Sequence, residues 1–232
     1  MRNNFRFKQF EIEQLDAPMP VTTDACILGA IAKFDTCADV LDIGCGTGLL
    51  GLMVAQNHAK VQITGVDIQP QSVKTAIYNA QKSPWKDRIS IKEMDVLSEM
   101  FLSQFDGIIC NPPFFENQLA SAMEGKRLAR HTGNLNYGNL IKKISELLLP
   151  HGIVWLLVPN LHVEIVFGEM KKANLYVTEN WHIKSMANKA PHVHVLKLEK
   201  LERAVSTFEF ITYSHVGVRS EQLNHLMQEF YL

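Results

Sequence analysis

The chain has 232 residues, of which 47% are apolar and 20% charged, so it is long enough for one large domain and too apolar for a disordered protein. The net charge of -1 excludes a strong overall basic field, and any nucleic-acid binding must come from local patches. The four cysteines include no CxxC pair, and no apolar run approaches roughly 18 residues, so we expect a cytoplasmic protein without a membrane span or a metal site.

Hydrophobic periodicity predicts alternating strands and helices after a mixed N-terminal segment. A helix is expected from about Ala25 to Phe34, with Asp24 as its N-cap. Beyond it, short apolar runs typical of strands alternate with runs typical of helices, which favours a mostly parallel sheet with helices on both faces. The expected strands are 38–44, 61–68, 88–95, 105–110 and 152–159, and the expected helices are 49–58, 70–83, 97–102, 137–149 and 163–173.

The pattern changes beyond Asn174. Three strand-like runs, 175–184, 192–200 and 204–212, follow without long helices, so we expect them to extend the sheet with antiparallel neighbours. An amphipathic helix capped by Ser220 should follow. The chain is therefore interpreted as a single α/β domain. It is divided into an N-terminal lid and helix extension (1–35), a cofactor-binding core (36–173) and the C-terminal strands and helix (174–232).

The segment DIGCGTG, Asp42 to Gly48, closes the first strand of the alternation and opens a helix, where α/β sheets bind nucleotides. Gly44, Gly46 and Gly48 do not follow the GxGxxG order of pyrophosphate-binding loops, and an acid precedes them. An acidic side chain repels phosphate and attracts a cation. S-adenosylmethionine has no phosphate and carries a sulfonium and an ammonium group. We therefore predict that it binds here, with Asp42 holding the ammonium directly or through water.

Two further acids stand at the ends of the next strands. Asp67 follows the glycine loop by about twenty residues, where an acid accepts hydrogen bonds from both ribose hydroxyls of a nucleotide. Asp95 ends the following strand, and its carboxylate is predicted to accept the adenine amino group of the cofactor while Val96 packs on the ring. The alternative is that Asp95 only caps the helix expected after it.

The fourth core strand ends in a stiff elbow made by Asn111, Pro112, Pro113 and Phe114. The separation from Asp42 is 111 - 42 = 69 residues, about three strand–helix units, which places Asn111 at the same sheet edge as the glycine loop. The Asn111 amide oxygen and the Pro112 carbonyl can each accept one N–H of a planar amine and orient its nitrogen. Pro113 restricts Pro112 to an extended conformation, and Phe114 can stack on a flipped-out base.

These motifs carry a resemblance to known families. DIGCGTG, GVDI and NPPFF resemble the Rossmann-fold amino-methyltransferases with an [N/D]PP[Y/F] motif. More narrowly, FRFKQFEIEQLDAPMPVTTDACILGAIA, NAQKSPWKDRI, RLARHT, PHVHVLKL and QEFYL resemble the bacterial tRNA adenine-N6 methyltransferases that modify the adenine beside the anticodon of a valine tRNA. The resemblance implies S-adenosylmethionine as cofactor, adenine N6 as acceptor and tRNA as partner, and makes FKQF part of a cofactor lid. That family more often has Tyr where Phe114 stands.

Two basic segments are candidates for RNA contact. The long connection after the elbow contains Lys126, Arg127, Arg130 and His131, and a second segment near the sheet end contains Lys189 and His192. A solvated basic surface is the alternative for both. His192 and His194 alternate along one strand, but two ligands without a third make a poor metal site.

The leading prediction is therefore an S-adenosylmethionine-dependent methyltransferase, expected to be a monomer, that acts on adenine N6 in tRNA. Two other hypotheses stay open at this point. One keeps the chemistry and changes the acceptor to guanine N2 in ribosomal RNA or to a glutamine amide in a protein. The other is a catalytically inactive scaffold that binds RNA or a partner enzyme.

Overall fold

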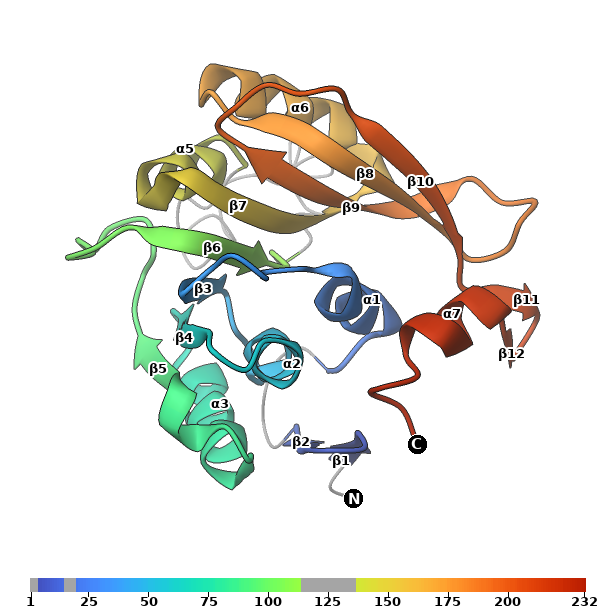
Figure 1. Cartoon of the computed structure of the whole chain (residues 1–232), viewed down its shortest axis with the longest axis horizontal. Coiled ribbons are helices and arrows are strands. Elements are labelled where there is room, and N and C mark those ends of the chain that lie inside the picture. Colours follow the sequence, from blue (N-terminus) through green and yellow to red (C-terminus); the bar gives the residue numbers. More distant parts are fainter. Residues whose placement is uncertain (1–3, 15–19, 114–136) are drawn as a thin grey trace, which may run out of the picture.

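The computed structural model describes residues 4–14, 20–113 and 137–232, and its centre is an eight-stranded sheet (Figure 1). The order across this sheet is β10-β8-β9-β7-β6-β3-β4-β5. The strands are β3 (Asp39–Ile43), β4 (Gln62–Asp67), β5 (Ile89–Glu93), β6 (Phe105–Cys110), β7 (Leu148–Pro159), β8 (Tyr176–Lys184), β9 (Pro191–Glu199) and β10 (Ser206–Ile211). The five core strands and the three C-terminal strands thus form where the sequence predicted them.

Helices cover both faces of the sheet, as the alternating pattern predicted. They are α1 (Thr23–Ile31), α2 (Leu49–Asn57), α3 (Pro70–Lys82), α5 (Tyr137–Leu147), α6 (Val163–Lys172) and α7 (Glu221–Leu226). Successive strand residues point to opposite faces. Val40 and Ile109 therefore join one buried cluster with α1, α2 and α7, whereas Leu41 and Ile108 join a second with α5 and α6. The core is two apolar layers, one on each face.

The strand directions place a topological switch point in the middle of the sheet. From β3 the chain continues to β4 and β5 on one side, and then returns to β6 and β7 on the other. All of these neighbours are parallel. Parallel sheets bind their ligands at the carboxyl ends of the strands beside such a point.

The C-terminal strands depart from the prediction in one respect. β9 is antiparallel to both β7 and β8, as expected, but β10 pairs with β8 in the parallel direction. β7 and β8 already occupy the two edges of β9, so β10 takes the remaining edge of β8. Because the chain reverses direction both between β8 and β9 and between β9 and β10, β8 and β10 run the same way. The expectation of only antiparallel neighbours was therefore wrong for β10.

Two helix predictions also need correction. Helix α1 begins at Thr23 and its N-cap is Thr22, whose Oγ1 accepts the Ala25 N–H at 3.2 Å, rather than Asp24. The expected helix over residues 97–102 is not formed; a turn at 96–98 takes its place. Ser220 does cap α7, since its Oγ accepts the Leu223 N–H at 3.0 Å.

Two small hairpins were not predicted. The first, β1 (Asn4–Arg6) with β2 (Glu11–Glu13), is called the N-terminal hairpin below. The rings of Phe7 and Phe10 stack in its turn at a centroid distance of 4.3 Å, and the Lys8 N–H donates to the Phe230 carbonyl at 2.8 Å. The second hairpin joins β11 (Tyr213–His215) to β12 (Val218–Arg219). Figure 1 shows the C-terminal end of the chain near α7 and the N-terminal hairpin.

Candidate active site

The residues expected to form the site lie where neighbouring parallel strands end. This side of the sheet, at the carboxyl ends of the strands, is called the ligand edge below. Ile43, the last residue of β3, pairs with Val66 in β4 and with Cys110 in β6. The glycine loop (residues 44–48), Asp67 and Asn111 follow these paired residues directly. They therefore lie together at the carboxyl ends of three adjacent parallel strands, on the two sides of the switch point.

The glycine loop has a backbone that only glycine adopts without strain. Gly44, Gly46 and Gly48 have φ angles of 68°, 56° and 81°, which lie in the left-handed region. Among the described residues, an added Cβ at Gly44 would meet no heavy atom within 4 Å, and one at Gly46 would meet only the Gly44 carbonyl oxygen at 3.9 Å. The space in front of these two glycines is therefore open, and a ligand can approach the backbone closely.

Asp42 lies beneath this loop and is 1% exposed. Its Oδ2 accepts the Gly51 N–H at 3.0 Å, whereas its Oδ1 has no hydrogen-bond partner among the described residues. The pKa of Asp42 is raised to about 7, mainly because the carboxyl is buried; the bond from Gly51 opposes this rise, and the nearby charge of Asp67 adds to it. A buried carboxyl oxygen that lacks a partner among the described residues, in a group with a pKa near 7, suits a cationic donor.

Asp67, at the carboxyl end of β4, hydrogen-bonds the backbone of the glycine loop. Its Oδ2 accepts the Gly46 N–H at 2.9 Å and its Oδ1 accepts the Gln69 N–H at 2.8 Å. A carboxylate oxygen can accept a second hydrogen bond. Asp67 can thus order the loop and still accept the ribose hydroxyls predicted for it.

Asp95 accepts hydrogen bonds from the turn that follows it, whereas the alternative interpretation had it capping a helix there. Its Oδ1 accepts the Leu97 N–H at 2.9 Å, and its carbonyl accepts the N–H groups of Ser98 and Glu99. Val96 is 8% exposed and belongs to the apolar layer that contains Ile43. A contact of Asp95 and Val96 with the cofactor adenine stays a prediction.

The elbow carries a second unpaired acceptor. Asn111 is half-buried, and its Oδ1 has no hydrogen-bond partner in the part of the chain that the structure describes. Pro112 is buried and Pro113 is exposed. Phe114 lies outside the described residues. The amide of Asn111 is therefore available to a ligand at the edge where the glycine loop opens.

The residues predicted to contact RNA are only partly described. Lys126, Arg127, Arg130 and His131 lie outside the described residues. Lys189 is exposed in the connection from β8 to β9, whose ends reach the same sheet edge as Asn111. His192 pairs with Asp24 Oδ1 at 3.0 Å through its Nε2, and this bond raises the pKa of His192. His192 thus joins β9 to the first turn of α1.

Sequence reasoning missed several polar side chains around this edge. The Tyr137 hydroxyl lies 3.1 Å from His162 Nδ1, and both side chains are buried. Asn79 in α3 is 1% exposed and hydrogen-bonds the glycine-loop residue Thr47. Its signal was available in the sequence, because Asn79 is an amide at the helical position where Val73 and Ala76 mark the buried face.

The unpaired acceptors of the described residues at this edge fit two groups: Asp42 Oδ1 suits the ammonium of S-adenosylmethionine, and Asn111 Oδ1 suits an amine substrate beside it. Two buried acceptors, Asp42 Oδ1 and Asn111 Oδ1, stand at one edge without partners among the described residues, and the glycine loop between them is open. Neither atom suits a phosphate, whereas both suit N–H donors. Within residues 4–14, 20–113 and 137–232, no group of three His, Cys, Asp or Glu side chains is placed to hold a metal ion, and no helix is long and apolar enough to cross a membrane.

Sequence comparisons match the chain to characterised families. Residues 26–163 match the family model described as methyltransferase small domain. The chain is 37% identical to the tRNA1(Val) (adenine(37)-N6)-methyltransferase of Vibrio vulnificus, over 98% of this chain and 95% of the relative. It is 35% identical to the same-named protein of Shewanella loihica, over 98% of both chains, and 33% identical to that of Vibrio cholerae, over 100% of this chain and 96% of the relative.

Solved structures agree on the fold. A predicted O-methyltransferase from Agrobacterium tumefaciens superposes with a TM-score of 0.70 at 17% identity, covering 89% of this chain and 96% of that one. A TehB-like S-adenosylmethionine-dependent methyltransferase from Corynebacterium glutamicum gives a TM-score of 0.53 at 15% identity, over 79% and 90%. The expected Rossmann-like methyltransferase fold is thereby confirmed.

Proposed function

Because the chain belongs to the family of the tRNA1(Val) (adenine(37)-N6)-methyltransferases, we propose that it transfers a methyl group from S-adenosylmethionine to the exocyclic N6 of an adenine in tRNA. The finer proposal is that this adenine lies beside the anticodon of a valine tRNA. Such a substrate places the enzyme in the cytoplasm. The single structural observation that supports the chemistry is Asn111 Oδ1, which has no hydrogen-bond partner among the described residues and lies at the edge where the glycine loop opens.

The proposed mechanism starts from the weakness of the acceptor. The lone pair of an adenine amino group is delocalised into the ring, so the nitrogen is a poor nucleophile until it is oriented. Asn111 Oδ1 and the Pro112 carbonyl accept its two N–H bonds and hold the nitrogen in line with the methyl donor. When bound, S-adenosylmethionine supplies an electrophilic methyl group. The methylated nitrogen then sheds its proton readily, so a strong base is not required.

The remaining residues hold the two substrates. Asp42 is proposed to receive the ammonium group of the cofactor at its unpaired Oδ1, and Asp67 to receive the ribose hydroxyls. Because Asn111 carries no charge, the negative charge that attracts the cationic cofactor comes from these two acids. Stacking of the flipped-out adenine on Phe114 is proposed from the sequence and from the usual recognition of extruded bases.

The test is methyl transfer from labelled S-adenosylmethionine to total RNA, and separately to total protein, from cells that lack the gene, followed by mapping of the labelled nucleotide or residue. We expect N6-methyladenosine in one valine tRNA, beside the anticodon. Label in N2-methylguanosine of ribosomal RNA, or in a glutamine of a protein, would replace the proposed acceptor by an alternative. Absence of cofactor binding in calorimetry would favour the inactive scaffold.

A further inference from the structure

We propose that Asn79 is a positioning residue, through which the N-terminal hairpin holds the glycine loop in the conformation that binds S-adenosylmethionine. This inference rests on the proposed function, because it concerns the same cofactor site. It adds a residue from α3, and a distant segment of the chain, to the groups that determine cofactor affinity.

The side chain of Asn79 bridges two segments that are far apart in sequence. Its Nδ2 donates to the Thr47 carbonyl at 2.9 Å and to the Glu13 carbonyl at 3.0 Å. Its Oδ1 accepts the Glu13 N–H at 3.0 Å. One amide therefore uses both of its N–H bonds and its oxygen to join the glycine loop to the hairpin strand β2.

On the loop side, the bridge acts at Thr47, between two glycines whose φ angles are positive. Thr47 is 5% exposed and stands directly before Gly48, the N-cap of α2. The glycines around it give the loop more conformational freedom than other residues would. The other end of the loop is already fixed, because the Gly44 N–H donates to the Val66 carbonyl at 2.9 Å. Asn79 supplies the corresponding anchor at the helix end.

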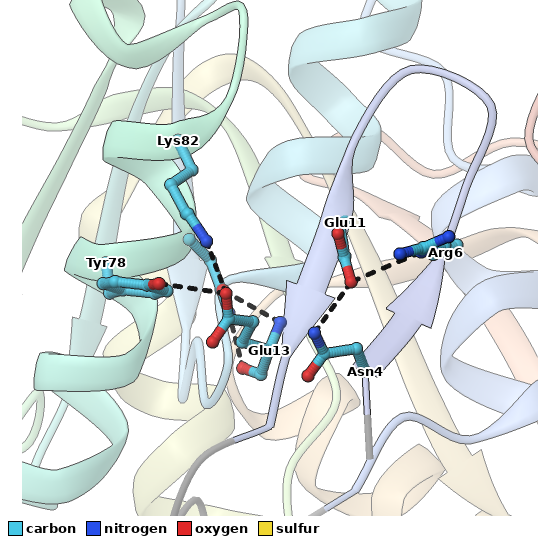
Figure 2. Close-up of polar contacts among 7 residues, drawn as sticks. Asn4, Arg6, Glu11, Glu13, Tyr78 and Lys82 are labelled. Atoms are coloured by element: carbon cyan, nitrogen blue, oxygen red, sulfur yellow. Dashed lines mark hydrogen bonds and ion pairs between the residues drawn. The ribbon is translucent and has the colours of Figure 1, made fainter. Parts of the chain in front are cut away.

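On the hairpin side, Glu13 is held firmly enough to act as a support. Its side chain is buried, and its Oε1 accepts hydrogen bonds from the Tyr78 hydroxyl at 2.9 Å and from Lys82 Nζ. Figure 2 shows Glu13 pointing from β2 toward Tyr78 and Lys82 on α3. The backbone groups of Glu13 that Asn79 contacts therefore belong to a segment docked on the same helix.

The hairpin also has internal polar contacts that are independent of the bridge. Glu11 Oε1 accepts from Asn4 Nδ2 at 2.8 Å and lies 3.6 Å from Arg6 Nε, as Figure 2 shows. These contacts are on exposed side chains and join β1 to β2. Loss of Asn79 is thus expected to uncouple the hairpin from the loop without dissolving the hairpin itself.

A purely structural role for Asn79 makes a different prediction, which a matched control separates. The variant Ser83→Ala removes two hydrogen bonds at the C-terminal end of the same helix, from Ser83 Oγ to the Ala80 carbonyl and from the Trp85 N–H to Ser83 Oγ, and leaves Glu13 and the bridge to Thr47 intact. Both this control and Asn79→Ala should lower the unfolding temperature. Only Asn79→Ala should weaken binding of the cofactor.

The experiment measures the Kd of S-adenosylmethionine by calorimetry and the steady-state KM and kcat with tRNA, in the full chain. For Asn79→Ala, and for the shape-matched Asn79→Asp, we expect Kd and KM for the cofactor to rise about tenfold, the equivalent of one lost hydrogen bond, while kcat at saturating cofactor stays within about twofold. In the control variant, Kd should stay within about twofold. An unchanged Kd in both Asn79 variants, or an equal rise in the control, would overturn the inference. Failure of the wild-type chain to bind the cofactor would overturn the proposed function as well.

A second measurement needs no variant and so remains decisive if the Asn79 variants fail to fold. Coupling is reciprocal: if the docked hairpin strengthens cofactor binding, the cofactor must stabilise the docked hairpin. Amide hydrogen exchange of the wild-type chain should therefore slow at Glu13 when S-adenosylmethionine is added. Exchange at Thr212, whose N–H donates to the Lys184 carbonyl away from the bridge, should not change. An unaltered exchange rate at Glu13 would contradict the coupling.

Discussion

Ile43 and Cys110 are register partners in neighbouring parallel strands, and each is the last residue of its strand. Gly44 and Asn111 therefore leave the sheet side by side. Asn111 Oδ1 and Asp42 Oδ1 are both buried without a hydrogen-bond partner among the described residues, a state that costs about 1–3 kcal/mol for each group. Hydrogen-bond donors of a bound ligand would offset this cost. The two acceptors therefore lower the stability of the free protein and favour the ligand-bound state.

The first prediction concerns the pH dependence of stability that Asp42 produces. Its pKa is raised to about 7 in the folded protein, so the native state keeps a proton that the unfolded chain releases between about pH 4 and 7. Stability should fall as the pH rises through this window. In the variant Asp42→Asn the side chain cannot ionise, so this fall in stability should be absent. Urea denaturation of both proteins without ligand should show the variant gaining stability relative to wild type from pH 5 to pH 7, and a pH-independent difference would contradict the assignment.

The second prediction concerns the same carboxylate with ligand present. An ammonium group favours the charged form of Asp42, so S-adenosylmethionine should bind wild type more tightly as the pH rises from 5.5 to 7.5. Titration calorimetry across this range should give a steeper pH dependence for wild type than for Asp42→Asn. Parallel profiles would show that the ammonium does not contact Asp42.

The third prediction concerns the backbone of the glycine loop. Gly46 has a φ of 56°, so Gly46→Ala should cost about 1–2 kcal/mol of stability from backbone strain, although space for the methyl group exists. Because the Gly46 N–H also contacts Asp67, the variant should weaken cofactor binding. Gly168→Ala in α6 is the control, since the added methyl meets no heavy atom within 4 Å and helix propensity should raise stability by about 0.5–1 kcal/mol. Equal thermal unfolding of the two variants would refute this interpretation.

The fourth prediction concerns Arg88, which fixes the end of α2 on the side of the sheet away from the ligand edge. Its guanidinium donates to the carbonyls of Ala55, His58 and Val61 at 2.6, 2.9 and 2.8 Å. Arg88→Ala should cost roughly 2–4 kcal/mol, because three carbonyls lose a charged donor.

The control for Arg88 is another arginine. Arg203→Ala breaks an exposed ion pair with Glu199 and should cost less than about 1 kcal/mol. Guanidinium denaturation measures both changes. A loss for Arg88→Ala no larger than that for Arg203→Ala would show that the three bonds add little to stability.

The core of the fold was predictable because its signals are local. Each core strand is an apolar run bounded by glycine, proline or polar residues; α3, α5 and α6 show the helical period, whereas α2 is apolar nearly throughout. The placement of Asp42, Asp67 and Asn111 followed from the rule that parallel strands present their carboxyl ends at one edge. These residues were found without any knowledge of tertiary contacts.

What the sequence did not predict depends on contacts between distant segments. The strands of the N-terminal hairpin are only three residues each, and Phe7 and Phe10 are buried by packing near Phe230 at the other end of the chain. The direction of β10 follows from which strand edge remained free. Asn79 was overlooked because an amide on a buried helix face acquires a role only when Glu13 and Thr47 meet it.

The most direct test of the central claim is single-turnover methyl transfer to an unmodified valine tRNA transcript by wild type and by Asn111→Ala. If Asn111 orients the adenine amine, the variant should lose a hundredfold or more of the wild-type rate, about the effect of removing one transition-state hydrogen-bonding group, while its Kd for S-adenosylmethionine stays close to wild type. A near-normal rate of N6-methyladenosine formation by Asn111→Ala would contradict the role assigned to the elbow.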